Sequence, residues 1–214
     1  MDILGGLESG EKYHLKVPGL GYAIEIPYTV LPSDERGLRI ASLNLVGQTR
    51  LNRDLGRLLA GRIREAFPDL SGIVFLTAVE KALMLVQAAA QELDVEAVAV
   101  AYNRVKPHME ADRRPLIQVG SSSVTSGSKF MALYERDINL IGLASRGIVI
   151  IDDVVSTGGT LLALEDLLEE VAAHRDHPLP EILGVFCVAQ EGELQTLPAY
   201  PIHFLTRLPM PEFV

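Results

Sequence analysis

The order of apolar segments in the middle of the chain constrains the fold more than any other feature. Short apolar runs that suit buried strands alternate with longer stretches whose apolar residues recur at helical spacing. The runs lie at residues 72–76, 96–102, 147–151, 181–189 and 202–206, and the helical stretches lie at 51–63, 81–93 and beyond 160. Strands that alternate with helices pair in parallel, because each helix carries the chain back to the same end of the sheet. The sequence therefore predicts an α/β fold with a mostly parallel twisted sheet flanked by helices.

Two regions fall outside this alternation. Residues 1–49 are rich in glycine, proline and β-forming residues, and we expect them to form a separate flap. Residues 106–128 form a long polar excursion between strands. Excursions longer than about 15 residues are uncommon in compact domains unless they act as lids or are disordered, although a solvated hairpin is an equal alternative here. We therefore divide the chain into an N-terminal segment (1–49), an α/β core (50–188) with a mobile lid at about 106–128, and a C-terminal segment (189–214).

Composition excludes several classes of protein. The net charge of −9 argues against broad affinity for nucleic acid or anionic membranes, although local donors and Mg²⁺ can still bind a phosphorylated substrate. The single cysteine, Cys187, excludes an internal disulfide and a cysteine-rich zinc site. No apolar segment reaches the roughly 18 residues of a membrane span, and the N-terminus has acid and glycine where a signal peptide has basic and apolar runs. We expect a cytoplasmic protein without nucleic-acid or membrane partners.

The most informative local stretch is "VIIDDVVSTGGT", residues 149–160. Asp152 and Asp153 follow an apolar strand directly, although neighbouring carboxylates repel each other, and ligands of open α/β sheets lie beyond the carboxyl ends of strands. The turn that follows combines hydroxyl donors, a glycine backbone and a helix N-terminus, all of which favour a phosphate. Its residues are Ser156, Thr157, Gly158, Gly159 and Thr160. Because carboxylates accept hydrogen bonds from sugar hydroxyls or hold hydrated Mg²⁺, the stretch predicts a sugar phosphate bound across both halves.

This stretch resembles the signature of the type I phosphoribosyltransferases, which bind 5-phosphoribosyl-1-pyrophosphate (PRPP). The similarity covers twelve consecutive positions and extends more weakly over about residues 45–210. It implies the fold of that family, with a small hood formed by the N-terminal segment and the C-terminal strands, Mg²⁺ as cofactor, and a homodimer. An ordinary strand-to-helix turn with an incidental acidic pair is the alternative. A dinucleotide-binding fold is disfavoured because no G-x-G-x-x-G follows the first strand, and the Walker-like residues 5–12 have one residue too many and follow no strand.

The resemblance also implies a pyrophosphate site. Residues 77–82, "TAVEKA", occupy the place of the family's pyrophosphate loop, with alanine at 82 where glycine is usual. Residues 101–109, "AYNRVKPHM", resemble the basic stretch after the next strand. The implied pyrophosphate ligands are Ala78, Glu80, Lys81, Arg104 and Lys106. In the lid, the candidate anion contacts are Arg113, Arg114 and Lys129. Without the resemblance, Glu80 and Lys81 are also typical of the first turn of a surface helix, and Arg104 and Lys106 of a solvated strand end.

The remaining roles follow from the reaction that the resemblance implies. Displacement of pyrophosphate from the ribose passes through a cationic, oxocarbenium-like state, which carboxylates favour. Asp152 and Asp153 are therefore the candidate catalytic residues and the candidate Mg²⁺ ligands, mainly through substrate or water. Asp153 is also the candidate acceptor of the proton that the attacking base releases. The implied base pocket contains Val154, Gln190 and Glu191.

The resemblance favours adenine as the base, and hence a role in purine salvage. Adenine enzymes typically show Ala-Thr-Gly-Gly-Thr where this chain has Ser-Thr-Gly-Gly-Thr, whereas the hypoxanthine-guanine branch has aspartate at the position of Ser156. Xanthine enzymes carry a lysine in the base pocket, and the corresponding segment "CVAQEGE" has none. The stretch "NRVKPHM" matches the lid motif of the orotate enzymes only in part. Xanthine or orotate transfer stays an alternative, as does a non-catalytic protein that senses PRPP, although such sensors usually carry a basic DNA-binding domain that is not evident here.

Overall fold

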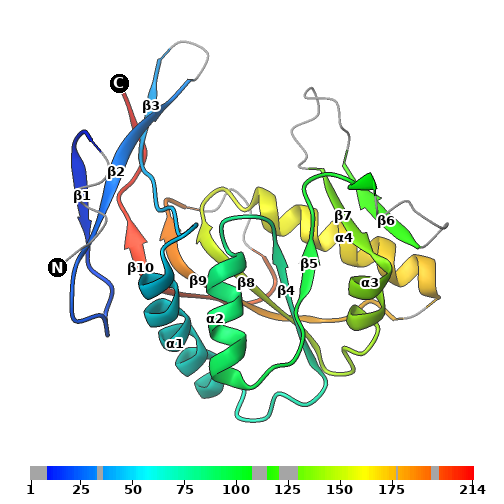
Figure 1. Cartoon of the computed structure of the whole chain (residues 1–214). Coiled ribbons are helices and arrows are strands. Elements are labelled where there is room, and N and C mark those ends of the chain that lie inside the picture. The colour runs from blue at the N-terminus through cyan, green and yellow to red at the C-terminus, as the bar shows by residue number, and fades with distance from the viewer. Residues whose placement is uncertain (1–8, 33–35, 108–114, 121–129, 177, 194–197) are drawn as a thin grey trace.

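The core of the molecule is a five-stranded sheet whose neighbouring strands are all parallel, in the order β10-β9-β8-β4-β5. The computed structural model describes residues 9–32, 36–107, 115–120, 130–176, 178–193 and 198–214. The strands of this sheet are β4 (Ile73–Ala78), β5 (Ala99–Ala101), β8 (Gly147–Val155), β9 (Ile182–Glu191) and β10 (Ile202–Leu208). The predicted α/β architecture is therefore confirmed (Figure 1).

Helices cover both faces of this sheet and create two hydrophobic clusters. One face packs against α1 (Thr49–Ala66) and α2 (Leu83–Leu93), and the other against α3 (Glu135–Ile141) and α4 (Gly159–Arg175). Along β8, Val149 and Ile151 belong to the first cluster, whereas the alternate residues Ile148 and Ile150 belong to the second. Successive side chains of a strand point to opposite faces, so a strand covered on both faces must be apolar throughout. This double burial explains the unbroken apolar runs of the sequence.

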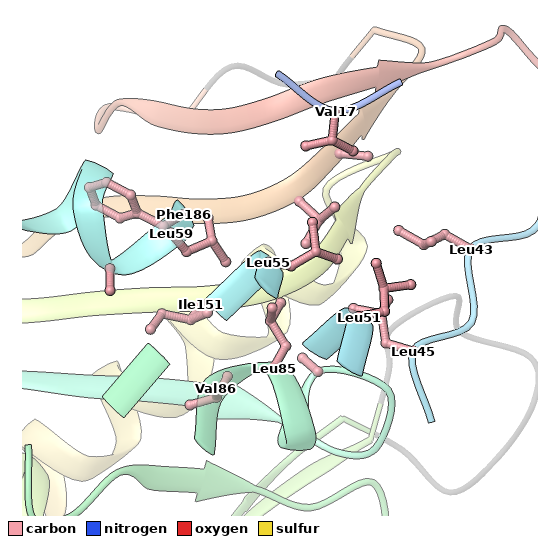
Figure 2. Packing of buried hydrophobic residues seen from close by; sticks show 14 of the residues in the cluster. Val17, Leu43, Leu45, Leu51, Leu55, Leu59, Leu85, Val86, Ile151 and Phe186 are labelled. Carbon is pink, nitrogen blue, oxygen red and sulfur yellow. The ribbon is translucent and has the colours of Figure 1, made fainter. Parts of the chain in front are cut away.

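A second sheet, the hood, consists of β1 (Lys12–Leu15), β2 (Ile24–Leu31), β3 (Leu38–Ala41) and β11 (Glu212–Phe213), all antiparallel. Figure 2 shows Val17, Leu43 and Leu45 from this part of the chain packed in the same cluster as Leu51 and Leu55 of α1. The hood and the core are thus joined by continuous apolar packing, and the predicted hood is confirmed.

The C-terminal contribution to the hood differs from the expectation in one respect. Of the described strands after Ala189, only β11 joins the hood sheet, through pairing with β3. Strand β10 instead extends the parallel sheet, with Ile202 opposite Val185 and Phe204 opposite Cys187 of β9. Ile202 and Phe204 pack against the second core cluster, whereas Leu208 belongs to the first. Apolar contacts on both faces account for the place of β10 in the core.

The predicted polar excursion contains one described strand. β6 (Leu116–Val119) pairs antiparallel with β7 (Met131–Tyr134), and a bridge between Tyr102 and Ala132 attaches β7 to the edge beyond β5. The described part of the excursion is therefore one arm of a hairpin, which lies at the upper right of Figure 1. Arg113, Arg114 and Lys129, together with most of the predicted lid, lie outside the described residues.

Element boundaries differ from the expectation mainly around the acidic pair. β8 continues through Val155 instead of ending at Ile151, because Val154 and Val155 still pair with Ala189 and Gln190 of β9. The helix expected from residue 81 begins at Leu83, after a turn. None of the described helices is both long enough and apolar enough to cross a membrane.

Candidate active site

A cavity of about 570 Å³ lies where the carboxyl ends of the parallel strands meet the hood. Its walls include the last residue of β4 (Ala78), of β9 (Glu191) and of β10 (Leu208), and residues 152–155 at the end of β8. Residues 40–43, which belong to β3 and the segment after it, close the cavity from the hood side. Parallel strands place all their carboxyl ends at one edge, so residues from four distant segments converge here.

The acidic pair lies in this cavity wall. Asp152 and Asp153 are only 8% and 9% exposed, and the backbone N–H of Asp153 donates a hydrogen bond to Oδ1 of Asp152 at 2.9 Å. Asp152 also lies opposite the buried Cys187 of β9. Burial raises the pKa of the Cys187 thiol, and the nearby Asp152 carboxylate raises it further. The thiol is therefore neutral, and the acidic chemistry of this edge belongs to the two aspartates.

The turn after β8 is shaped for an anion. Gly158 has a φ of +86°, in the left-handed region that favours glycine, and it precedes α4, which begins at Gly159. No side chain caps the N-terminus of α4, and all five predicted phosphate ligands, residues 156–160, line the cavity. The first turn of a helix has N–H groups without partners inside the helix, and the positive end of its dipole attracts negative charge. This end of the cavity therefore suits a phosphate group.

The pyrophosphate loop predicted at residues 77–82 also lines the cavity, through residues 78–82. Its peptide bond between Val79 and Glu80 is cis, and the N–H of Val79 donates to the carbonyl oxygen of Ala101 on β5. Ala82, which stands where the family usually has glycine, has an ordinary φ of −79° and a buried methyl group in the first core cluster. The alanine therefore causes no backbone strain at this position.

Most, but not all, of the predicted site residues line this one cavity. Ala78, Glu80 and Lys81 line the same cavity as the acidic pair, the anion-binding turn, Val154 and Glu191. Arg104, Lys106 and Gln190 are not among the lining residues, and Arg104 is exposed to solvent. Asn103, which follows β5, occupies the cavity wall near the expected basic stretch.

Several lining residues were not named from the sequence. They include Ile40, Ser42, Leu43, Asn103, Phe130 and Leu208. The hood residues and Leu208 reach the site only through tertiary packing, and no local motif marks them. Asn103 could have been found, because it lies just beyond the carboxyl end of a parallel strand.

The described wall of the cavity is strongly acidic. Its charged side chains are four carboxylates, from Glu80, Asp152, Asp153 and Glu191, against a single ammonium group, from Lys81. Burial raises the pKa of Glu191, and the positive charge of Lys81 opposes this rise. No group of three or more histidine, cysteine, aspartate and glutamate side chains that could hold a metal occurs among the described residues. A metal ion here would therefore need ligands from substrate or water besides the acidic pair.

Comparisons with known proteins agree with this geometry. The phosphoribosyl transferase domain model matches residues 44–204, whereas a comparison with curated protein sequences gives no match. Adenine phosphoribosyltransferase from Thermoanaerobacter pseudethanolicus is similar in structure, with a TM-score of 0.54 and 15% identity over 85% of this chain and 95% of that one. The Rhodothermus marinus enzyme gives a TM-score of 0.54 and 19% identity, over 85% and 94% of the two chains. An adenine phosphoribosyltransferase from Trypanosoma brucei, in complex with AMP, pyrophosphate and ribose-5-phosphate, gives a TM-score of 0.54 and 18% identity, over 84% of this chain and 76% of that one.

At these identities the structural neighbours establish the fold alone. The domain model is the stronger finding, because it spans most of the 214 residues and includes the acidic pair, the turn at residues 156–160 and the loop at residues 77–82. The chain therefore belongs to the phosphoribosyltransferase family of enzymes.

Proposed function

We propose that this enzyme is a purine phosphoribosyltransferase of the adenine type, which transfers the 5-phosphoribosyl group of PRPP to a purine base and releases pyrophosphate. The observation that carries the proposal is the meeting of three features in one cavity. These are the acidic pair at the end of β8, the anion-binding turn with its uncapped helix, and the pyrophosphate loop after β4. PRPP has phosphate at both ends of a ribose, so it requires an anion site on each side of a sugar site.

The substrate groups can be assigned to these features. The 5′-phosphate would bind residues 156–160, which line the cavity and offer backbone N–H groups and three hydroxyls as donors. The ribose would lie against Asp152 and Asp153, which accept hydrogen bonds from its hydroxyls. The pyrophosphate would extend toward Ala78, Glu80 and Lys81. Arg104 and Lys106 remain proposed pyrophosphate ligands, and Arg113, Arg114 and Lys129 remain proposed anion contacts of the lid.

The charge of the cavity supports a requirement for Mg²⁺. The described wall sets four carboxylates against one lysine, so a polyanionic substrate needs additional positive charge, which Mg²⁺ can supply beside the proposed cationic side chains. Carboxylate oxygens are ligands that Mg²⁺ prefers, and this ion usually keeps several waters and binds substrate phosphates. Asp152 and Asp153 fit that donor set. When bound, Mg²⁺ supplies positive charge that stabilises the departing pyrophosphate.

The residues then account for the bond changes. The bond between the anomeric carbon and the pyrophosphate oxygen breaks, and a ring nitrogen of the base forms the new bond to that carbon. The buried carboxylates of Asp152 and Asp153 favour the positive charge that develops on the ribose. Asp153 accepts the proton that the ring nitrogen loses. Enclosure by the hood and a closing lid would keep water away from the cationic sugar and limit hydrolysis of PRPP.

The choice of adenine is supported by the Ser-Thr-Gly-Gly-Thr turn and by the adenine enzymes among the structural neighbours. The test is to incubate the protein with PRPP, Mg²⁺ and one base at a time, and to follow pyrophosphate release. We expect turnover with adenine. Turnover with xanthine or orotate alone would replace the adenine assignment, and PRPP binding without consumption of any base would indicate a sensor.

We further propose that the enzyme acts as a cytoplasmic homodimer in purine salvage. Sedimentation or light scattering of the purified protein tests the dimer, because the expected mass is twice the 23.3 kDa of one chain. A monomer at the concentration of the activity assay would contradict the dimer while leaving the reaction in place.

A further inference from the structure

One corner of the cavity is apolar and differs in character from the phosphate and ribose sites. Leu43 and Leu208 are buried there in the first core cluster, and Val154 packs against the same cluster. These three residues come from the hood side, from β10 and from β8, the two strands that flank β9, so the corner lies under the hood at the carboxyl ends of these strands. Apolar walls of this kind suit the flat face of a heterocyclic base.

Glu191 adds a carboxylate to this apolar corner. It ends β9 and lies opposite Leu208 of β10, with which it shares the cavity wall. Burial raises its pKa, as expected for a carboxylate that has lost part of its hydration, although the charge of Lys81 opposes the rise. Within the described part of the chain, its side chain forms no hydrogen bond or ion pair. A partly desolvated carboxylate without a protein donor is free to accept a hydrogen bond from a ligand that displaces its water.

We propose that Glu191 is a specificity-determining residue that accepts a hydrogen bond from an amino group of the base. The proposal rests on the proposed function and adds the substrate class: bases that present an N–H donor at this edge, in preference to bases that present a carbonyl oxygen. An ionised carboxylate is only an acceptor. A carbonyl oxygen opposite it would place two acceptors together and leave both unpaired, which is costly in a partly buried site.

The other polar group on this side of the cavity does not provide the same discrimination. Ser42 lines the cavity from the segment that follows β3, but a hydroxyl both donates and accepts and therefore tolerates either substituent. Gln190, the neighbour of Glu191, is not among the lining residues. Asp152 and Asp153 are assigned to the ribose. Selection between amino and oxo bases therefore falls to Glu191.

Adenine and hypoxanthine provide a direct test, because they differ in the amino or oxo group on the six-membered ring. The wild type should have a higher kcat/KM for adenine. Glu191→Gln should reduce the adenine-to-hypoxanthine preference by about 10- to 100-fold, because glutamine can donate to a carbonyl as well as accept from an amino group. Glu191→Ala, which removes the acceptor, should reduce it as well. Glu193→Gln is the matched control: it removes the same charge two residues away at an exposed position outside the lining residues and should keep the wild-type preference.

Calorimetric binding of AMP and IMP gives a second readout that does not depend on turnover. We expect the wild type to bind AMP more tightly and Glu191→Gln to bring the two affinities together. If the wild type transfers a base but both Glu191 variants keep its preference and its AMP-to-IMP affinity ratio, the role of Glu191 is wrong and the proposed function stands. If the wild type consumes no base and binds neither nucleotide, the proposed function fails and this inference fails with it.

Discussion

The backbone N–H of Asp153 donates a 2.9 Å hydrogen bond to Oδ1 of Asp152, within a strand segment where both residues are nearly buried. This bond orients one carboxylate through the peptide group of its neighbour. It also helps to explain how two adjacent acidic residues fit at the end of β8, where the strand still pairs with β9.

Replacement of either aspartate should impair transfer more than phosphate binding. We expect Asp152→Asn and Asp153→Asn each to lower kcat by about 100-fold or more, because each removes a fixed negative charge beside the developing cation. AMP affinity without Mg²⁺ should change little, because its phosphate binds the turn after β8. Pyrophosphate release and calorimetry measure the two effects. A kcat close to that of the wild type in both variants would remove the acidic pair from the mechanism.

Gly158→Ala should weaken both the fold and the anion site. Its φ of +86° is unfavourable for a residue with a side chain, so the substitution should lower the free energy of unfolding by about 1–2 kcal/mol. It should also reduce PRPP affinity, because the turn would relax away from its binding geometry. Denaturant titration and calorimetry measure these changes.

A matched control is available in α1. Gly61 lies within the helix with open space around its Cβ position and without a positive φ. Gly61→Ala should therefore raise the free energy of unfolding by up to about 1 kcal/mol and leave PRPP affinity unchanged. Equal effects of the two substitutions would contradict the strain argument.

Asp137 should be important for holding α3 against β5 at the edge of the sheet. It is fully buried, and its Oδ1 accepts from the N–H of Val100 on β5 and from Nη2 of Arg136 at 2.6 Å. Asp137→Ala should lower the free energy of unfolding by about 1–3 kcal/mol, because the N–H of Val100 loses its acceptor. Asp137→Asn should cost less, since the amide oxygen can still accept that hydrogen bond.

Arg136→Gln provides the comparison for Asp137. The Arg136 side chain is 68% exposed, so its loss should cost less than about 1 kcal/mol. Denaturant titrations of the variants under one buffer condition measure the series. A larger loss from Arg136→Gln than from Asp137→Ala would show that the ion pair, and not the backbone contact, holds this edge.

Stability should fall as the pH is lowered through the range in which His203 titrates. Its imidazole stacks on Phe186 with ring centroids 4.5 Å apart, and burial, together with the charge of Arg62, lowers its pKa below 6.5. The neutral form is therefore favoured in the folded state, and the unfolded chain binds more protons just below pH 6.5. The stabilisation is complete above that pH and is lost as the pH falls through the folded pKa.

His203→Phe should remove this part of the pH dependence while keeping the stacked ring. The measurement is the thermal unfolding midpoint at pH 7.5 and at pH 5.5. The decrease in the midpoint between the two pH values should be smaller in the variant than in the wild type. An equal drop in both proteins would show that other groups determine the acid sensitivity.

Most of the fold was predictable because its signals are local. Val149 and Ile151 face one set of helices and Ile148 and Ile150 the other, so burial on both faces is visible in the sequence as one apolar run. The turn after β8 was predictable for the same reason, since its hydroxyls, glycines and acidic neighbours lie within nine successive positions from Asp152 to Thr160.

The remaining features depend on tertiary pairing. The apolar run ends at Ile151, but β8 continues because residues up to Val155 find partners on β9. Leu43 and Leu208 are far apart in the chain, and only the packing of the hood on the core brings both to the cavity. The basic character of Arg104 suggested a ligand, but the side chain at the cavity wall belongs to Asn103.

The central claim is that the cavity at the end of β8 binds PRPP with the help of Mg²⁺. Calorimetric titration of PRPP into the protein, with Mg²⁺ and again with EDTA, tests this claim most directly. The account predicts one saturable site per chain with Mg²⁺, and much weaker binding both in EDTA and after simultaneous Asp152→Asn and Asp153→Asn substitution. Absence of binding in the presence of Mg²⁺, or binding that neither EDTA nor the double substitution weakens, would contradict it.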